Sequence, residues 1–141
     1  MRHRVQDGDA GRMIEAMHAL FYSEDPEATR AFFKDVLQLP FVSEAETSEP
    51  GDWLIFSSGP SEFGVHPATG PEGQQWAPPG QQQVSFVCDD IAATVRELEG
   101  RGATFAGEPQ SMGFGTGVSM VVPGAADVLV YQPRHKTAYD L

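Results

Sequence analysis

Two histidines and two glutamines have the residue types and the placement to bind a metal ion or a polar ligand together. Imidazole is the commonest metal ligand among side chains, and a glutamine amide offers both an acceptor oxygen and donor protons. Two neutral imidazoles and two amides bring no negative charge to balance a divalent cation, so a metal centre and a metal-free pocket both stay open. The four residues are His18, His66, Gln83 and Gln132.

These four residues form a set because the sequence repeats itself. Asp25 and Asp90 both have the features of a helix N-cap and stand 65 residues apart. The same offset places Phe21 on Phe86. With this offset the first histidine falls on the first glutamine, and the second histidine falls within one residue of the second glutamine.

Each half of the chain predicts a strand, a helix and three short strands, in that order. Asp25 and Pro26 provide the start of the first helix, and Gly102 provides the end of the second. Short apolar or alternating runs between turn residues predict the strands. The predicted helices are 26–37 and 91–101, and the predicted strands are 15–22, 41–45, 53–57, 62–66, 82–88, 104–106, 117–122 and 127–132.

These elements predict an α+β fold of two tandem βαβββ modules, which form a curved mixed sheet with the helices on its outer face. Residues 1–12 are polar and without period, and we expect them to form a flexible arm. A single domain is predicted over 13–141. It divides into a first module at 13–67, a linker at 68–80, a second module at 81–133 and a tail at 134–141.

Strand periodicity predicts that the four polar side chains point the same way. Successive side chains of a strand point to opposite faces of the sheet. In the first strand Phe21 lies on one face and His18 on the other, and Phe86 and Gln83 alternate in the same way in the second half. If the two phenylalanines face the helices, the polar set faces the concave side of the sheet.

Charge and composition limit the classes of partner. The 141 residues carry a net charge of −11, which disfavours nucleic acid. A run of about 18 apolar residues is missing, and the first residues lack the apolar segment of a secretory signal, so we expect neither membrane insertion nor export. The single cysteine, Cys88, excludes an internal disulfide and indicates a cytoplasmic protein.

Three segments carry a resemblance to a known family. They are Met-His-Ala-Leu-Phe-Tyr at 17–22, Ala-Thr-Arg-Ala-Phe-Phe-Lys-Asp-Val-Leu at 28–37 and Val-Ser-Phe-Val-Cys-Asp-Asp-Ile at 84–91. These segments resemble the vicinal oxygen chelate superfamily, which includes glyoxalases, extradiol dioxygenases and bleomycin resistance proteins. The resemblance extends over about 13–136 and supports the predicted fold.

The resemblance also implies a function. In metal-using relatives the four matched positions bind a divalent ion, so it implies Zn, Ni, Fe or Mn at His18, His66, Gln83 and Gln132 and a lyase or dioxygenase acting on a small molecule with vicinal oxygens. Glyoxalase-like members usually have a carboxylate at the position of His66 or Gln132, which this chain lacks. Glu62, on the same strand face as His66, is the nearest substitute. The resemblance implies a homodimer as well.

The predicted positions of other residues place them in the same pocket. Tyr22 lies on the ligand face of the first strand and is predicted to be a catalytic acid or hydrogen-bond donor. The loop 113–117 is predicted to form a lid. His3 and His135 lie in predicted surface segments and have no predicted role. The predicted walls of the substrate pocket are Phe56, Phe114 and Trp53.

Three functions remain open from the sequence. A metal-dependent enzyme would use both histidines to hold the ion. A metal-free binding protein of the bleomycin-resistance type would hold a small molecule between aromatic and polar groups. A degenerate member would have a regulatory or partner-binding role. Sensitivity to chelators separates the first two, and neither nucleic acid nor membrane is an expected partner.

Overall fold

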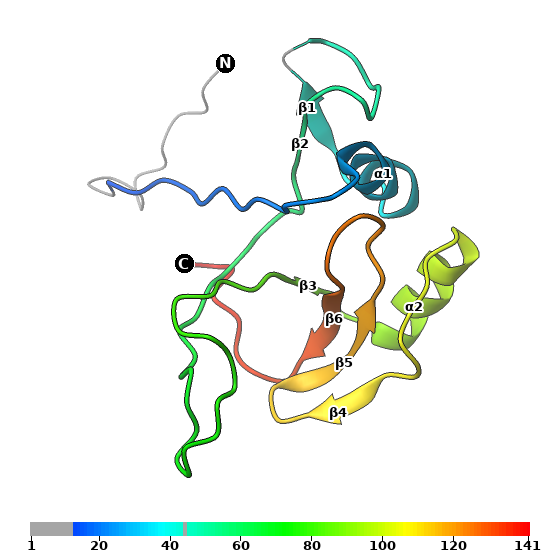
Figure 1. The fold of residues 1–141 in the computed structure, drawn as a ribbon. Coiled ribbons are helices and arrows are strands. Elements are labelled where there is room, and N and C mark those ends of the chain that lie inside the picture. Colours follow the sequence, from blue (N-terminus) through cyan, green and yellow to red (C-terminus); the bar gives the residue numbers. More distant parts are fainter. Residues whose placement is uncertain (1–12, 44) are drawn as a thin grey trace.

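The computed structural model describes residues 13–43 and 45–141, and these residues form an α+β fold with two separate sheets (Figure 1). One sheet has two strands and the other has four, and the four-stranded sheet contains one parallel pair. The prediction of an α+β fold with a mixed sheet is therefore confirmed. The single continuous sheet predicted for two tandem modules is not formed.

The second half of the chain has the predicted order of a strand, a helix and three strands. Strand β3 (Ser85–Val87) leads into helix α2 (Ile91–Gly100), and β4 (Gln110–Met112), β5 (Gly115–Met120) and β6 (Val128–Pro133) follow. Their order in the sheet is β3-β6-β5-β4, with β3 parallel to β6 and the other neighbours antiparallel. Asp90 caps α2 as predicted, because its Oδ1 accepts a hydrogen bond from the Ala93 N–H at 3.0 Å.

The first half has the predicted helix but only two strands. Helix α1 (Pro26–Ala31) continues without a break into a π-helical turn, η2 (Phe32–Val36), in which the Leu37 N–H donates to the Phe32 carbonyl. Asp25 caps α1 through a bond from Ala28 N–H at 3.1 Å. Strands β1 (Phe41–Ser43) and β2 (Leu54–Phe56) then pair antiparallel.

The hydrophobic core lies between the four-stranded sheet and the helices. Val118, Met120, Val128 and Val130 form one face of β5 and β6, and Met120 is fully buried. Phenylalanines from η2 and Ile91 of α2 join them in one cluster. Alternation along β5 and β6 therefore places every second side chain in the core, which leaves the intervening ones on the opposite face.

A polar junction joins the two halves of the chain. The buried Thr29 of α1 donates through Oγ1 to the Pro123 carbonyl at 2.6 Å, and the Glu24 N–H donates to the Gly124 carbonyl at 2.8 Å. Gly124 has φ of +81°, and a Cβ there would lie 2.6 Å from Ser23 Oγ. The close approach of α1 to the β5–β6 turn thus requires glycine at this position.

Two predicted strands do not form. Residues 15–22 run as an extended segment with exposed apolar side chains, and in Figure 1 this blue segment leaves the rest of the fold. Residues 62–66 are also irregular. Side-chain alternation predicts which residues of a strand would share a face of the sheet. A strand forms only if a neighbouring strand is available for backbone hydrogen bonds. The predicted strand at 104–106 is reduced to one bridge between Phe105 and Met120, while β4 forms where a loop was predicted.

One prediction concerns residues that the structure does not describe. The predicted arm at 1–12 and His3 within it lie outside the described residues. In the part of the chain that is described, no helix has the length and apolar character needed to cross a membrane.

Candidate functional site on the open face of the sheet

The register of the four-stranded sheet defines an open face, opposite the core. Across the sheet Val87 of β3, Tyr131 of β6 and Gly117 of β5 lie in one row, and Leu129 and Ser119 lie in the next. Helix α2 packs on the other side, because Ile91 joins the core cluster with Val130. We name the side of the sheet that carries Tyr131 and Leu129 the open face.

An aromatic pair occupies one end of this face. A Cβ on Gly117 would lie 2.8 Å from Tyr131 Cβ, so glycine lets the tyrosine lie close to β5. The Phe114 ring, from the β4–β5 turn, packs edge-on against Tyr131 with 5.1 Å between ring centroids. Phe114 remains 42% exposed and Tyr131 only partly buried. Apolar ring surface is thus available beside a phenol hydroxyl.

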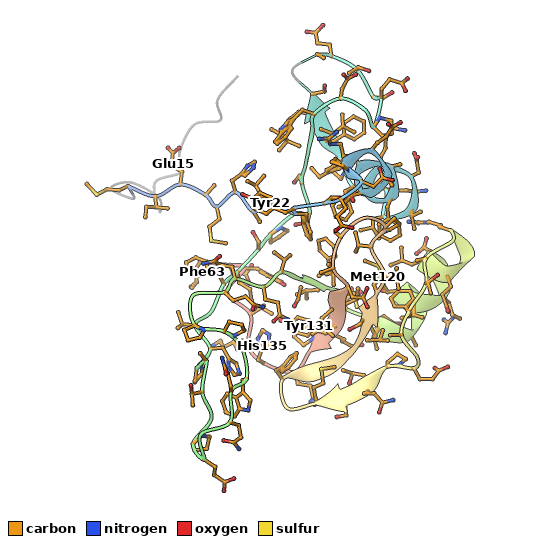
Figure 2. All side chains as sticks on the ribbon, viewed as in Figure 1. Glu15, Tyr22, Phe63, Met120, Tyr131 and His135 are labelled. Carbon is orange, nitrogen blue, oxygen red and sulfur yellow. The ribbon has the colours of Figure 1, made fainter. Side chains whose placement is uncertain are left out.

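The Tyr131 hydroxyl is hydrogen-bonded to an imidazole from the C-terminal tail. Tyr131 Oη lies 3.0 Å from Nε2 of His135, and the two residues lie side by side at the end of β6 (Figure 2). His135 Nδ1 lies 2.9 Å from the Lys136 carbonyl oxygen. A carbonyl can only accept, so Nδ1 carries the proton in the neutral ring. Nε2 is then the acceptor, and Tyr131 is the donor.

A carboxylate from a distant part of the chain completes the group. Glu62 Oε2 lies 3.6 Å from His135 Nε2, and Glu62 Oε1 accepts a hydrogen bond from the Ala138 N–H at 2.8 Å. Burial, the Glu62 carboxylate and Tyr139 raise the pKa of Tyr131. Burial and Glu62 also raise the pKa of Tyr139. Both phenols therefore stay protonated at neutral pH. We call Glu62, Tyr131, His135 and Tyr139 the tail cluster.

The four predicted metal ligands are not brought together. His18 lies on the exposed segment before α1, and Gln83 is exposed before β3. His66 is exposed as well; its Nδ1 lies 2.8 Å from the Pro67 carbonyl oxygen, and its ring lies edge-on to Trp76. Gln132 shares the core face with Val130, and its Oε1 accepts from the Ile91 N–H at 3.0 Å.

This placement does not fit a divalent ion. Gln132 caps the N-terminus of α2, so its amide oxygen is engaged on the side of the sheet away from the open face. Among residues 13–43 and 45–141, no three histidine, cysteine, aspartate or glutamate side chains gather in a way that could hold a metal. Glu62, the suggested substitute carboxylate, is hydrogen-bonded in the tail cluster instead.

The other predicted pocket residues are dispersed. Tyr22 is 89% exposed, and Figure 2 shows it on the extended segment, apart from Tyr131. Trp53 is 58% exposed, and the Arg30 guanidinium carbon lies over its ring, 5.5 Å from the centroid of the Trp53 ring. Phe56 packs in the core against the ring of Phe33 at 5.6 Å. Of the predicted pocket walls, only Phe114 belongs to the aromatic pair.

The tail cluster was missed because its members come from three separated segments. Glu62 and Ala138 are 76 residues apart in sequence. A local signal existed for one pair only, since Tyr131 and His135 are four residues apart. That spacing in a strand followed by a tail predicts no contact by itself.

Comparison with known proteins identifies the family. A family model described as the Glyoxalase/Bleomycin resistance protein/Dioxygenase superfamily matches residues 16–131, which is most of the chain. The chain belongs to this superfamily. No curated protein gives a significant match to the sequence.

One solved structure supports the α+β fold. The crystal structure of lactoylglutathione lyase from Agrobacterium tumefaciens has a TM-score of 0.55 and 22% identity, covering 84% of this chain and 92% of that one. An integron cassette protein from the mobile metagenome of V. Cholerae has a TM-score of 0.44 and 17% identity, covering 85% and 98%. At such identity the first likeness supports the fold and leaves the activity open.

Proposed function

We propose that this superfamily member binds a small organic molecule on the open face, between the Phe114 ring and the tail cluster, without a metal ion. One observation carries the proposal: the Phe114 ring contacts Tyr131, the Tyr131 hydroxyl contacts His135, and the Glu62 carboxylate lies 3.6 Å from that imidazole. Small-molecule sites combine apolar walls with a few polar groups that fix orientation.

The metal-dependent lyase or dioxygenase is the competing hypothesis. It rests on the resemblance of His18, His66, Gln83 and Gln132 to the ligand positions of metal-using relatives. The exposure of His18, His66 and Gln83 and the helix-capping bond of Gln132 speak against a shared ion. The two hypotheses differ in one simple respect, because a chelator should abolish metal-dependent binding and leave metal-free binding unchanged.

The test is a screen of small aromatic and heterocyclic compounds by ligand-observed NMR, with and without chelator. We expect binders that persist in chelator, that are lost in Phe114→Ala and that are retained in Trp53→Ala. Both aromatic residues were predicted pocket walls, so they form a matched pair. Binding lost with chelator, or lost equally in a His18→Ala, His66→Ala variant, would replace this proposal by the metal-dependent one.

We also propose a homodimer in a reducing, cytoplasmic setting. Residues before α1 expose large apolar side chains, with Met13 97% and Ile14 77% exposed, and such patches are typical of interaction surfaces. Cys88 has no cysteine partner in the chain. Light scattering is expected to give twice the mass of one chain, and a monomer at all concentrations tested would contradict the dimer.

A further inference from the structure

We propose that Tyr131, His135 and Glu62 form a proton-transfer chain that accepts a proton from, and returns it to, a small ligand with a weakly acidic phenol or enol hydroxyl. This inference rests on the proposed binding face and adds a chemical role and a ligand class. The carboxylate, imidazole and phenol come from the segment after β2, the tail and β6.

The direction of the chain follows from hydrogen-bond polarity. Because His135 Nδ1–H donates to the Lys136 carbonyl, Nε2 accepts a hydrogen bond from the Tyr131 hydroxyl. The Tyr131 oxygen has then used its only proton, so it faces a ligand with its lone pairs. A ligand group that binds Tyr131 Oη must therefore be a donor, which an O–H group is and a carbonyl is not.

Transfer along this chain is balanced. The ligand O–H bond breaks and its proton bonds to Tyr131 Oη, while the former hydroxyl proton of Tyr131 moves to His135 Nε2. The electron pair stays on the ligand oxygen, which becomes an oxyanion. The imidazolium that forms lies 3.6 Å from Glu62 Oε2, which stabilises it. The reverse sequence returns the proton, so no net oxidant or co-reactant is needed.

The surroundings of the imidazole favour this role. Glu62 is held in place by the Ala138 N–H, and its side chain is only 20% exposed, so its charge is partly shielded from water. Tyr131 and Tyr139 are the other ionisable groups of the cluster. Because the pKa of Tyr131 is raised, the phenol keeps its proton at neutral pH and relays protons without remaining ionised. The Phe114 ring, which packs against Tyr131 and stays 42% exposed, offers apolar surface to an aromatic ligand.

The first test needs no ligand. Long-range nitrogen–proton NMR spectra should show His135 as the Nδ1–H tautomer in the wild-type protein. Phenolate absorbance on raising the pH should show that Glu62→Gln lowers the pKa of Tyr131, identified by subtracting the titration of Tyr131→Phe. Glu72→Gln, which removes an exposed carboxylate from the loop before β3, is the matched control and should leave that pKa unchanged. An Nε2–H tautomer would overturn the proposed direction.

The second test uses para-nitrophenol, whose phenolate absorbs visible light. At a pH just below its own pKa, binding to the wild-type protein should increase the phenolate absorbance. Tyr131→Phe and His135→Gln should lose most of this increase when each variant is saturated with ligand, as checked by ligand-observed NMR, while Glu72→Gln should behave as wild type. Binding with equal ionisation in every variant would overturn the chain while leaving the binding face intact. Failure of Phe114→Ala to weaken binding would count against the binding face itself.

Discussion

The two halves of the chain have similar sequence patterns and different structures. In the second half β3, β6, β5 and β4 form one sheet that packs against α2 over a continuous core. In the first half β1 and β2 make a two-stranded sheet, and the segments before α1 and after β2 are irregular. A repeated pattern therefore does not guarantee a repeated structure.

Burial accounts for much of this difference. Strands β5 and β6 bury Val118, Met120, Val128 and Val130, and Met120 and the nearby Val122 are less than 2% exposed. In β1 and β2 only Leu54 is buried, while Val42 is 67% exposed. An isolated two-stranded sheet is marginally stable without such burial. The second half thus supplies the stable frame on which the open face is built.

The largest effect that tests this comparison comes from truncating one apolar side chain in each sheet. Met120→Ala should lower the free energy of unfolding by about 2–5 kcal/mol, because it removes a fully buried side chain. Ile55→Ala in β2 removes a side chain that is 37% exposed and should cost about 1 kcal/mol or less. Urea denaturation measures both. Equal losses would mean that the two sheets contribute alike.

A smaller effect is expected at the junction between the halves. Alanine at a left-handed position costs about 1–2 kcal/mol, and both Gly124 (φ +81°) and Gly73 (φ +84°) occupy such positions. A Cβ at Gly124 would also lie 2.6 Å from Ser23 Oγ, whereas a Cβ at Gly73 meets no atom within 4 Å. Thermal unfolding should therefore show Gly124→Ala to be the more destabilising. Equal shifts would indicate that α1 moves away freely.

The smallest effect separates the two glutamines of the predicted ligand set, Gln83 and Gln132. Gln132→Ala removes the acceptor for the Ile91 N–H and should cost about 1 kcal/mol. Gln83→Ala changes an exposed side chain and should stay within about 0.5 kcal/mol of the wild type. Thermal unfolding of both variants is the measurement. A larger loss for Gln83→Ala than for Gln132→Ala would contradict the structure, in which Gln132 caps a helix and Gln83 is exposed.

Local signals predicted both helices and some of the strands. Asp25 and Asp90 were recognised as caps, and both accept the expected bonds from N–H groups three residues on. Helix α2 and strand β6 also lie close to their predicted bounds. Caps and amphipathic periods depend on residues within one or two turns, which is why a single sequence contains enough information to place them.

The site was less predictable, because it depends on which face of β6 is covered. Alternation correctly separated Tyr131 from Gln132, but the face assigned to the ligand was that of Gln132. In the structure Val130 and Gln132 face α2, and Tyr131 faces away. The choice is fixed by packing between distant segments, as is the contact of Glu62 with the tail. Neither leaves a local pattern in the sequence.

Part of the proposed site lies in the C-terminal tail, outside the four-stranded sheet. Arg134 anchors the start of the tail through bonds to Thr116 Oγ1 and Ser111 Oγ on β5 and β4. Everything after it that contributes to the cluster, namely His135, the Ala138 N–H and Tyr139, lies outside the sheet. Cleavage after Arg134 by a protease would therefore remove the tail residues of the proposed site from a protein that still folds. Substitution of these last residues during evolution would change which ligand the proposed site binds.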